Sequence, residues 1–168
     1  MNGDHERDAA LSQAVRLREQ GLTERARDEL TALAERYPQD AEIAFQAAWA
    51  HDALGLEAEA VPFYERALTG GPGLSEEDRH GVFLGLGSTY RVLGRYDLSL
   101  RTLRSGLAEF PQDPALQAFL AMALYNTGQG REAVQTLLKT LTATSTDPRL
   151  LSYRPAIDHY ADDLDAVE

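Results

Sequence analysis

The side chains best suited to catalysis or metal binding are four scattered histidines: His5, His51, His80 and His159. A carboxylate lies four residues from two of them, as in Glu76 and His80, and this spacing places both side chains on one face of a helix. Such pairs are more often surface contacts than metal ligands. The sequence has no H-E-x-x-H motif, no G-x-x-x-x-G-K phosphate loop, no calcium-loop pattern and no cysteine. We therefore expect no enzymatic activity, no metal and no cofactor.

Length and composition narrow the class of protein further. The chain has 168 residues, which suits one domain, and 43% of them are hydrophobic. No segment approaches the roughly 18 consecutive apolar residues of a membrane span, and the N-terminal MNGDHERDAA lacks the apolar core of a signal peptide. A formal net charge of −11 argues against binding to a phosphate backbone, which needs a basic surface. We expect a cytoplasmic protein that binds neither nucleic acid nor membranes.

The stretch from Ala41 to Pro72 indicates two helices that fold back on each other at Gly55. Apolar or small residues at i, i+3, i+4 and i+7 form one stripe before this glycine and another after it. Glycine adopts the left-handed conformation that ends a helix at almost no cost. Two short helices joined by a tight turn pack antiparallel, and the small residues Ala48 and Ala60 let their axes approach. His51 lies inside this pair, so we interpret it as a core histidine rather than a general base.

The rest of the sequence repeats this unit. Turn glycines recur as Gly21, Gly55, Gly94 and Gly128, at spacings of 34, 39 and 34 residues, and prolines follow them as Pro38, Pro72 and Pro111. Three further columns recur: a small residue seven before the glycine, a small residue five after it and a large apolar residue nine after it. They are Ala14, Ala48, Gly87 and Ala121, then Ala26, Ala60, Ser99 and Ala133, then Leu30, Tyr64, Leu103 and Leu137.

This 34-residue pattern resembles the tetratricopeptide repeat, a helix-turn-helix unit that stacks into a solenoid. The third copy matches best, with Phe83, Leu86, Gly87, Tyr90, Gly94, Tyr96 and Pro111 on the family's positions. The resemblance implies an all-α fold, a right-handed α-solenoid of four repeats plus a C-terminal capping helix. We expect a disordered N-terminus over residues 1–7, repeats over 8–40, 41–74, 75–113 and 114–147, and the capping helix over 148–168.

Two departures from a regular array carry predictions. Ser75 followed by Asp78 resembles a capping box. The five extra residues before the third repeat should therefore lengthen its first helix at the start, after a flexible connection that contains Gly71. Pro62 lies in the second turn of a helix, where it removes a hydrogen bond, so we expect either a local bend or a late start of this helix, and we favour the late start.

The segment after Asp147 is expected to be a helix, with Asp147 as its N-cap and Pro148 in its first turn. One stripe has the spacing of a first helix and should cover the apolar end of the fourth repeat. It consists of Tyr153, Ala156, Ile157 and Tyr160. The acidic residues on the other side should then face solvent; they are Asp158, Asp162, Asp163 and Asp165.

In the family, the first helices line a concave groove that binds other proteins. Transferring the groove positions residue by residue gives Leu11, Val15, Arg18, Phe45, Trp49, Asp52, Leu84, Ser88, Arg91, Phe119, Met122 and Tyr125. Trp, Tyr and Arg commonly anchor interfaces. A second interpretation is that Trp49, Phe45 and Phe119 fill the angle between neighbouring first helices. Gly81 and Gly85 leave room either for a ligand backbone or for Trp49 and Phe119.

Two functional hypotheses follow. The first is a non-catalytic adaptor whose groove binds a peptide segment of another protein, with Trp49, Met122 and Tyr125 as anchors. The second is a self-associating structural module, a homodimer that pairs through an uncovered end repeat or through the groove. Some family members clamp a terminal carboxylate with basic residues, but the corresponding positions here supply no positive charge, so that mode is not expected. They are Leu11, Val15, Gln46, Gly81 and Gly85.

Overall fold

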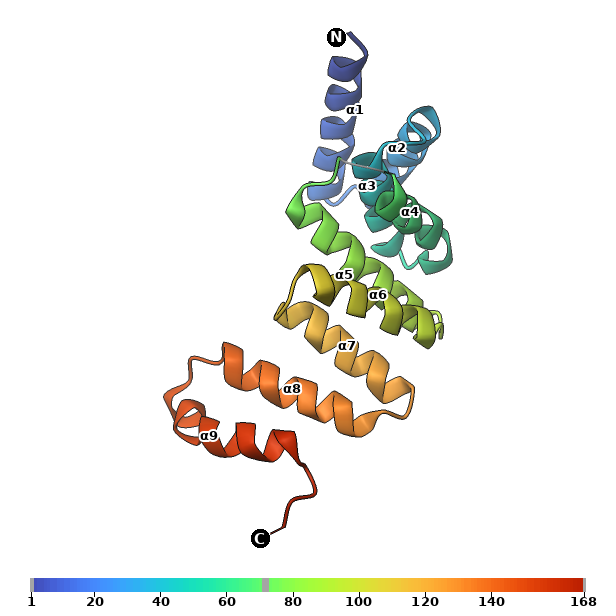
Figure 1. The fold of residues 1–168 in the computed structure, drawn as a ribbon. Helices are drawn as coiled ribbons and strands as arrows, with labels where there is room; N and C mark the ends of the chain where they lie inside the picture. Colours follow the sequence, from blue (N-terminus) through green and yellow to red (C-terminus); the bar gives the residue numbers. More distant parts are fainter. Residues whose placement is uncertain (1, 71–72, 168) are drawn as a thin grey trace.

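The computed structural model describes residues 2–70 and 73–167, and these residues form nine α-helices and no strand. The helices are α1 (Asn2–Glu19), α2 (Thr23–Arg36), α3 (Ala41–Asp52), α4 (Glu57–Thr69), α5 (Glu76–Val92), α6 (Tyr96–Glu109), α7 (Pro114–Asn126), α8 (Gly130–Thr144) and α9 (Pro148–Asp162). They stack from α1 at one end to α9 at the other, with the termini far apart (Figure 1). The expected all-α solenoid is confirmed. Gly71 and Pro72 lie outside the described residues.

Each of the four hairpins turns at the predicted glycine. The φ angles of these glycines lie between 71° and 79°, in the left-handed region that other residues adopt only with strain; they are Gly21, Gly55, Gly94 and Gly128. The following N–H closes the turn, as where Leu56 donates to the His51 carbonyl at 3.0 Å. This is the 6→1 hydrogen bond of a glycine helix end.

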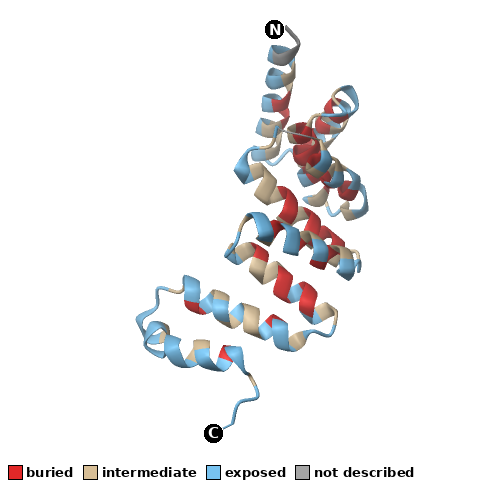
Figure 2. Cartoon of the chain, in the orientation of Figure 1, coloured by how far each residue is buried: buried red, intermediate tan, exposed pale blue. Residues whose placement is uncertain are grey.

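The two helices of a pair approach at small residues, as predicted. Ala48 and Ala60 are fully buried between α3 and α4. Between α5 and α6, Ser99 donates a hydrogen bond of 2.7 Å to the Gly87 carbonyl. A Cβ atom on Gly87 would lie 2.6 Å from the Leu103 side chain, so this position excludes a larger residue. Buried residues run through the helices up to α7 and are sparse in α8 and α9 (Figure 2).

Side-chain caps fix where the first helices begin. The Ser75 hydroxyl accepts from the Asp78 N–H at 3.0 Å, which confirms the predicted cap. As a result α5 has 17 residues, whereas α3 has 12. Asp147 caps α9 in the predicted way by accepting from the Arg149 N–H at 2.8 Å.

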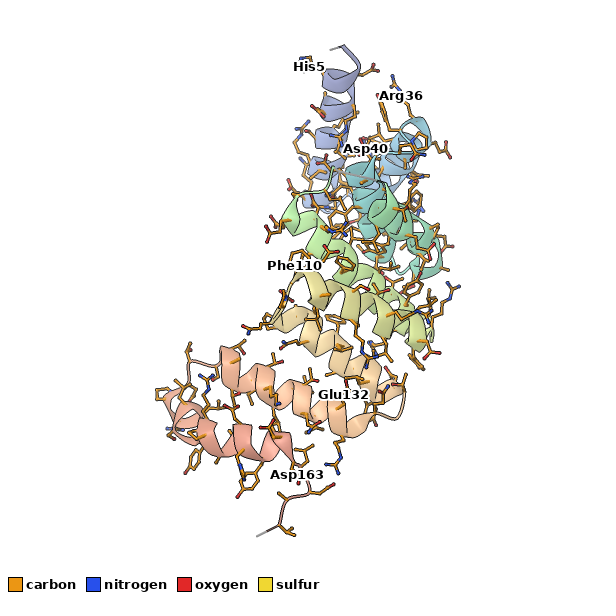
Figure 3. All side chains as sticks on the ribbon, viewed as in Figure 1. His5, Arg36, Asp40, Phe110, Glu132 and Asp163 are labelled. Atoms are coloured by element: carbon orange, nitrogen blue, oxygen red, sulfur yellow. The ribbon has the colours of Figure 1, made fainter. Side chains whose placement is uncertain are left out.

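The N-terminus differs from the prediction. α1 begins at Asn2, although residues 1–7 were expected to be disordered. Arg7 donates to Asp40 at 2.8 Å and to Glu42 at 2.6 Å, which ties the start of α1 to the start of α3; Asp40 is labelled in Figure 3. These partners are 33 and 35 positions away in sequence, so local composition does not reveal them.

The expected late start of α4 is also wrong. The helix begins at Glu57 and contains Pro62 in its interior. An interior proline costs about 3 kcal/mol. Its neighbours Ala60, Val61 and Tyr64 are buried against α3 and α5, and burying one large apolar side chain gains about 1.5–3 kcal/mol. Packing on both sides of the exposed proline therefore offsets its cost.

The helix α9 forms, but it presents a different side from the one predicted. The expected inward stripe is exposed at three of its positions and half-buried at the fourth; these are Tyr153, Ala156 and Tyr160, then Ile157. Within α9, Ala161 alone is buried among the described residues. The predicted burial of the stripe is therefore wrong.

The acidic side of α9 is largely exposed, as predicted, and it also contacts α8. Asp162, Asp163 and Asp165 are exposed and Asp158 is half-buried. Thr142 donates to Asp158 at 2.6 Å, and Lys139 pairs with Asp162 at 2.6 Å. Arg131 of α8 pairs with Asp163 at 3.8 Å; Asp163 is labelled at the C-terminal end of α9 in Figure 3. These contacts depend on residues of α8, so the stripe pattern of α9 alone does not show the orientation.

Candidate protein-binding groove

The twelve predicted groove residues differ widely in exposure. Two are buried and belong to the core, Leu11 and Phe45. Three are exposed, Trp49, Met122 and Tyr125. The other seven are partly exposed: Val15, Arg18, Asp52, Leu84, Ser88, Arg91 and Phe119.

Trp49 is the one exposed residue of α3. The helix is the most deeply buried of the array, and every other residue in it is buried or half-buried. Trp49 keeps 41% of its surface exposed. Its ring is covered on one face by the guanidinium of Arg18 from α1, whose Cζ lies 4.0 Å from the ring centroid. The side chain is thus held in place and still accessible.

Arg18 is also fixed from its other side. Its Nη1 donates to the amide oxygen of Gln46, which is itself buried. Burial lowers the pKa of Arg18, and Glu19 and Asp78 act on its charge only over a longer distance. The guanidinium is therefore held by an aromatic ring and an amide, which leaves donors for an acceptor from outside. The sequence carries no signal for these contacts, because Gln46 and Trp49 lie 28 and 31 positions after Arg18.

Asp52 acts as a link between helices rather than as a groove contact. It accepts hydrogen bonds from the hydroxyls of Tyr64 in α4 and Thr89 in α5, both at 3.2 Å. Burial raises the pKa of the Asp52 carboxyl, and burial followed by the charge of Asp52 raises the pKa of Tyr64. The three side chains join the second repeat to the third.

The glycines of α5 make room for aromatic rings of the protein itself. A Cβ on Gly81 would lie 2.7 Å from the Phe45 ring, and one on Gly85 would collide with the Tyr64 ring. Of the two explanations for these glycines, close packing therefore applies. The rings involved are Phe45 and Tyr64, not Trp49 and Phe119 as the sequence suggested.

Two hollows lie along the first helices. A cavity of about 470 Å³ beside α1, α3 and α5 has both charged and apolar walls, with Leu11, Val15 and Gln46 among its lining residues. A second one of about 400 Å³ lies between α7 and α8 and is mainly apolar, with Met122 and Tyr125 on its wall. Five of the predicted groove residues line these hollows, Leu11 and Val15 the first and Arg91, Met122 and Tyr125 the second.

The four histidines lie on separate helices, α1, α3, α5 and α9. His51 Nδ1 lies 2.8 Å from the Ala47 carbonyl and its ring stacks on Phe63, as expected for a core histidine. His80 pairs with Asp113 at 3.0 Å instead of with Glu76. Within residues 2–70 and 73–167, no group of three His, Cys, Asp or Glu side chains is placed to hold a metal ion. Over the same residues, no helix is both long and apolar enough to cross a membrane.

Comparison with known proteins identifies the family. Residues 41–164 match the family described as "Tetratrico peptide repeat", and residues 8–40 match the one described as "Tetratricopeptide repeat". No curated protein matches the chain.

Solved structures share the fold. The structure described as "Crystal structure of MamA protein" superposes with a TM-score of 0.72 at 14% identity, over 99% of this chain and 81% of that one. MamA from Desulfovibrio magneticus RS-1 gives a TM-score of 0.68 at 20% identity, over 94% and 89% of the two chains. YrrB, described as a TPR protein with an unusual peptide-binding site, gives 0.70 at 21% identity, over 92% and 76%. With a family match over most of its length, the chain belongs to the tetratricopeptide repeat family.

Proposed function

We propose that this protein-interaction repeat module is a non-catalytic adaptor, and that it holds a peptide segment of another protein in the groove at α1, α3 and α5. The observation that carries the proposal is the exposed Trp49 in an otherwise covered helix. A tryptophan on the surface of a rigid scaffold is the residue most often found at the energetic centre of an interface.

The surroundings of Trp49 support this role. Arg18 stacks on the ring and is itself fixed by Gln46, so little side-chain entropy is lost when a ligand binds. The open face of the indole can pack against an apolar side chain of the ligand. The free donors of Arg18 suit a carbonyl or carboxylate oxygen beside it.

A similar fold binds peptides in at least one case. YrrB is described as a TPR protein with an unusual peptide-binding site, and its fold resembles this one over 92% of the chain. The likeness supports peptide binding as a use of this scaffold. The identity of the ligand is set by groove residues such as Trp49 and Arg18, which belong to this sequence.

The test uses the single tryptophan of the chain. Peptides of about twelve residues would be selected from a displayed random library on the wild-type protein and titrated while the fluorescence of Trp49 is followed. Binding to the Trp49→Ala variant, measured by the anisotropy of labelled peptides, should be at least ~10-fold weaker, as expected for loss of a central anchor.

Val92→Ala is the matched control, because Val92 is an exposed apolar residue of α5, and it should bind like the wild type. Selected peptides that leave the Trp49 fluorescence unchanged and bind Trp49→Ala equally well would refute the groove assignment.

A further inference from the structure

The same two positions are buried in the second and third repeats and exposed in the fourth. Six residues after the turn glycine, Val61 and Leu100 are 5% and 6% exposed, whereas Val134 is 46% exposed. Nine residues after it, Tyr64 and Leu103 are 1% and 0% exposed, whereas Leu137 is 46% exposed. In α6, Leu100 and Leu103 belong to one cluster with residues of α7. The face of α8 that corresponds to it lacks such a cover.

The cover is missing because α9 lies on another side of α8. Ala133, buried toward α7, and Thr142, buried toward α9, are nine residues apart, which is two and a half helical turns. The two side chains therefore point in opposite directions. Figure 1 shows α8 between α7 and α9, and α7 and α9 do not contact each other within the described residues. Val134, Leu137 and Leu141 lie between the two contact sides.

The unused stripe of α9 lies on the same side of this three-helix layer. Tyr153 and Tyr160 are roughly a quarter turn from Ala161, which is buried against α8. Because α8 and α9 are antiparallel right-handed helices, this quarter turn brings both tyrosines to the side where Val134 and Leu137 are exposed. Tyr125 of α7, which is 73% exposed, lies on that side too. We call this surface the C-terminal face: Met122, Tyr125, Val134, Leu137, Leu141, Tyr153 and Tyr160.

We infer that the C-terminal face is the interface of a homodimer. The face contains both an open site for a first helix, on α7 and α8, and a stripe with the spacing of a first helix, on α9. Within one chain, the open site on α7 and α8 and the apolar stripe of α9 face the same side of the molecule. The stripe therefore cannot cover the open site of its own chain. A second copy turned by a two-fold axis brings its α9 over the site and offers its own site to the first copy's α9, which is an isologous arrangement.

The exposed area fits this occupant. Tyr125, Tyr153 and Tyr160 are 73%, 67% and 46% exposed. With ~150–250 Å² for a whole aromatic side chain, these three supply roughly 300–450 Å² per copy. The aliphatic residues of the face add to this area, and a standard interface buries about 800 Å² per partner.

Charge does not oppose the pairing, although the chain has a formal net charge of −11. All seven residues of the C-terminal face are uncharged. The nearby acidic groups Asp162 and Asp163 are paired with Lys139 and Arg131 on the flank of α8. Pairing of two copies through these seven residues therefore brings no like charges into direct contact.

The inference is independent of the proposed function at α1, α3 and α5 because it does not use Trp49 or Arg18; of the predicted groove residues, it uses only Met122 and Tyr125. Sedimentation equilibrium of the full chain should show a mass that rises with concentration from 18.5 kDa to twice that value. Leu137→Asp and, separately, Tyr153→Asp should weaken the dimer by at least ~100-fold, since each dimer would bury two unpaired carboxylates. Both side chains are already exposed in one copy, so circular dichroism should show unchanged helicity.

Two controls make the result decisive. Val92→Asp adds the same charge at an exposed position of α5 and should leave the dimer intact, as should Trp49→Ala. A wild-type chain that stays at 18.5 kDa up to ~1 mM would overturn the inference and leave the face to the helix of another protein. Dimers that survive both Leu137→Asp and Tyr153→Asp, or that Trp49→Ala dissociates, would place the interface elsewhere and also overturn it.

Discussion

The third and fourth repeats have the same local structure and different tertiary surroundings. Their turn glycines, Gly94 and Gly128, have φ angles of 72° and 78°, and the small residues Ser99 and Ala133 are buried in both. The third hairpin is nevertheless covered by the next first helix, and the fourth is not. The comparison shows that a hairpin of this kind is encoded within its own 34 residues, whereas its burial depends on how the next helix docks.

The largest expected difference in stability between the two repeats is at the position nine residues after the turn glycine. Leu103→Ala should lower the free energy of unfolding by about 2–5 kcal/mol, because it leaves a cavity in a packed site. Leu137→Ala should cost less than ~1 kcal/mol, because this side chain is half exposed already. Urea denaturation at a concentration where the chain is monomeric measures both. Equal losses would mean that α8 is covered in solution.

The turn glycines should show no such difference. Gly94→Ala and Gly128→Ala should each cost about 1–2 kcal/mol, since alanine is strained at positive φ. No other atom lies within 4 Å of a Cβ at either position, so the cost is local. Thermal unfolding followed by circular dichroism measures the two values. A clearly smaller cost at Gly128 would show that the fourth hairpin is already partly open.

The ion pairs between α8 and α9 should contribute less to the free energy of unfolding than Leu103 or the turn glycines. Lys139→Met removes the partner of Asp162, and both side chains are largely exposed, so the expected loss is ~0.2–1 kcal/mol. Hydrogen exchange of the α9 amides should become faster, while exchange in α3 stays the same. Faster exchange in α3 as well would show that α9 stabilises the whole array.

The smallest expected effect is a pH dependence of the free energy of unfolding, which arises from Asp52 at the junction of the second and third repeats. Burial raises the pKa of Asp52 above its ordinary value of 3.8, so the folded state binds this proton more tightly than the unfolded state. The stability that Asp52 contributes is therefore present at low pH and is lost as the pH rises through the folded-state pKa.

Asp52→Asn removes this titration and keeps an oxygen to accept from Tyr64 and Thr89. The free energy of unfolding of the variant minus that of the wild type should therefore be larger at pH 7 than at pH 4. Denaturation curves measured at both pH values give this difference. A gain that is larger at pH 4 would contradict the assigned direction of the shift.

Much of the fold could be predicted because its signals are local. A left-handed glycine, a capping serine and an alanine at a helix crossing act within one hairpin, so Gly55, Ser75 and Ala48 were predicted in their roles. The start of α1 could not be predicted in this way, since Arg7 finds its partners 33 and 35 positions later. The interior Pro62 is tolerated because of neighbours that are buried by other helices.

For the candidate site, the family's groove positions point to the first helices but do not show which of their side chains are exposed. Phe45 is a core residue and Asp52 is a link between repeats, whereas Trp49 is exposed beside Arg18. Each of these outcomes depends on which side chain from a neighbouring first helix comes close, and no spacing within one repeat records it.

The sequence by itself determined the four hairpins, their turns and the presence of a final helix, because helix periodicity and backbone conformation are properties of neighbouring residues. Only the tertiary structure decided which side of α9 faces α8. The helix carries both an apolar stripe and an acidic one, and either could have been turned toward α8. The acidic stripe does so: it pairs with Arg131 and Lys139 while staying largely exposed, and this leaves the apolar stripe beside the open face of α8.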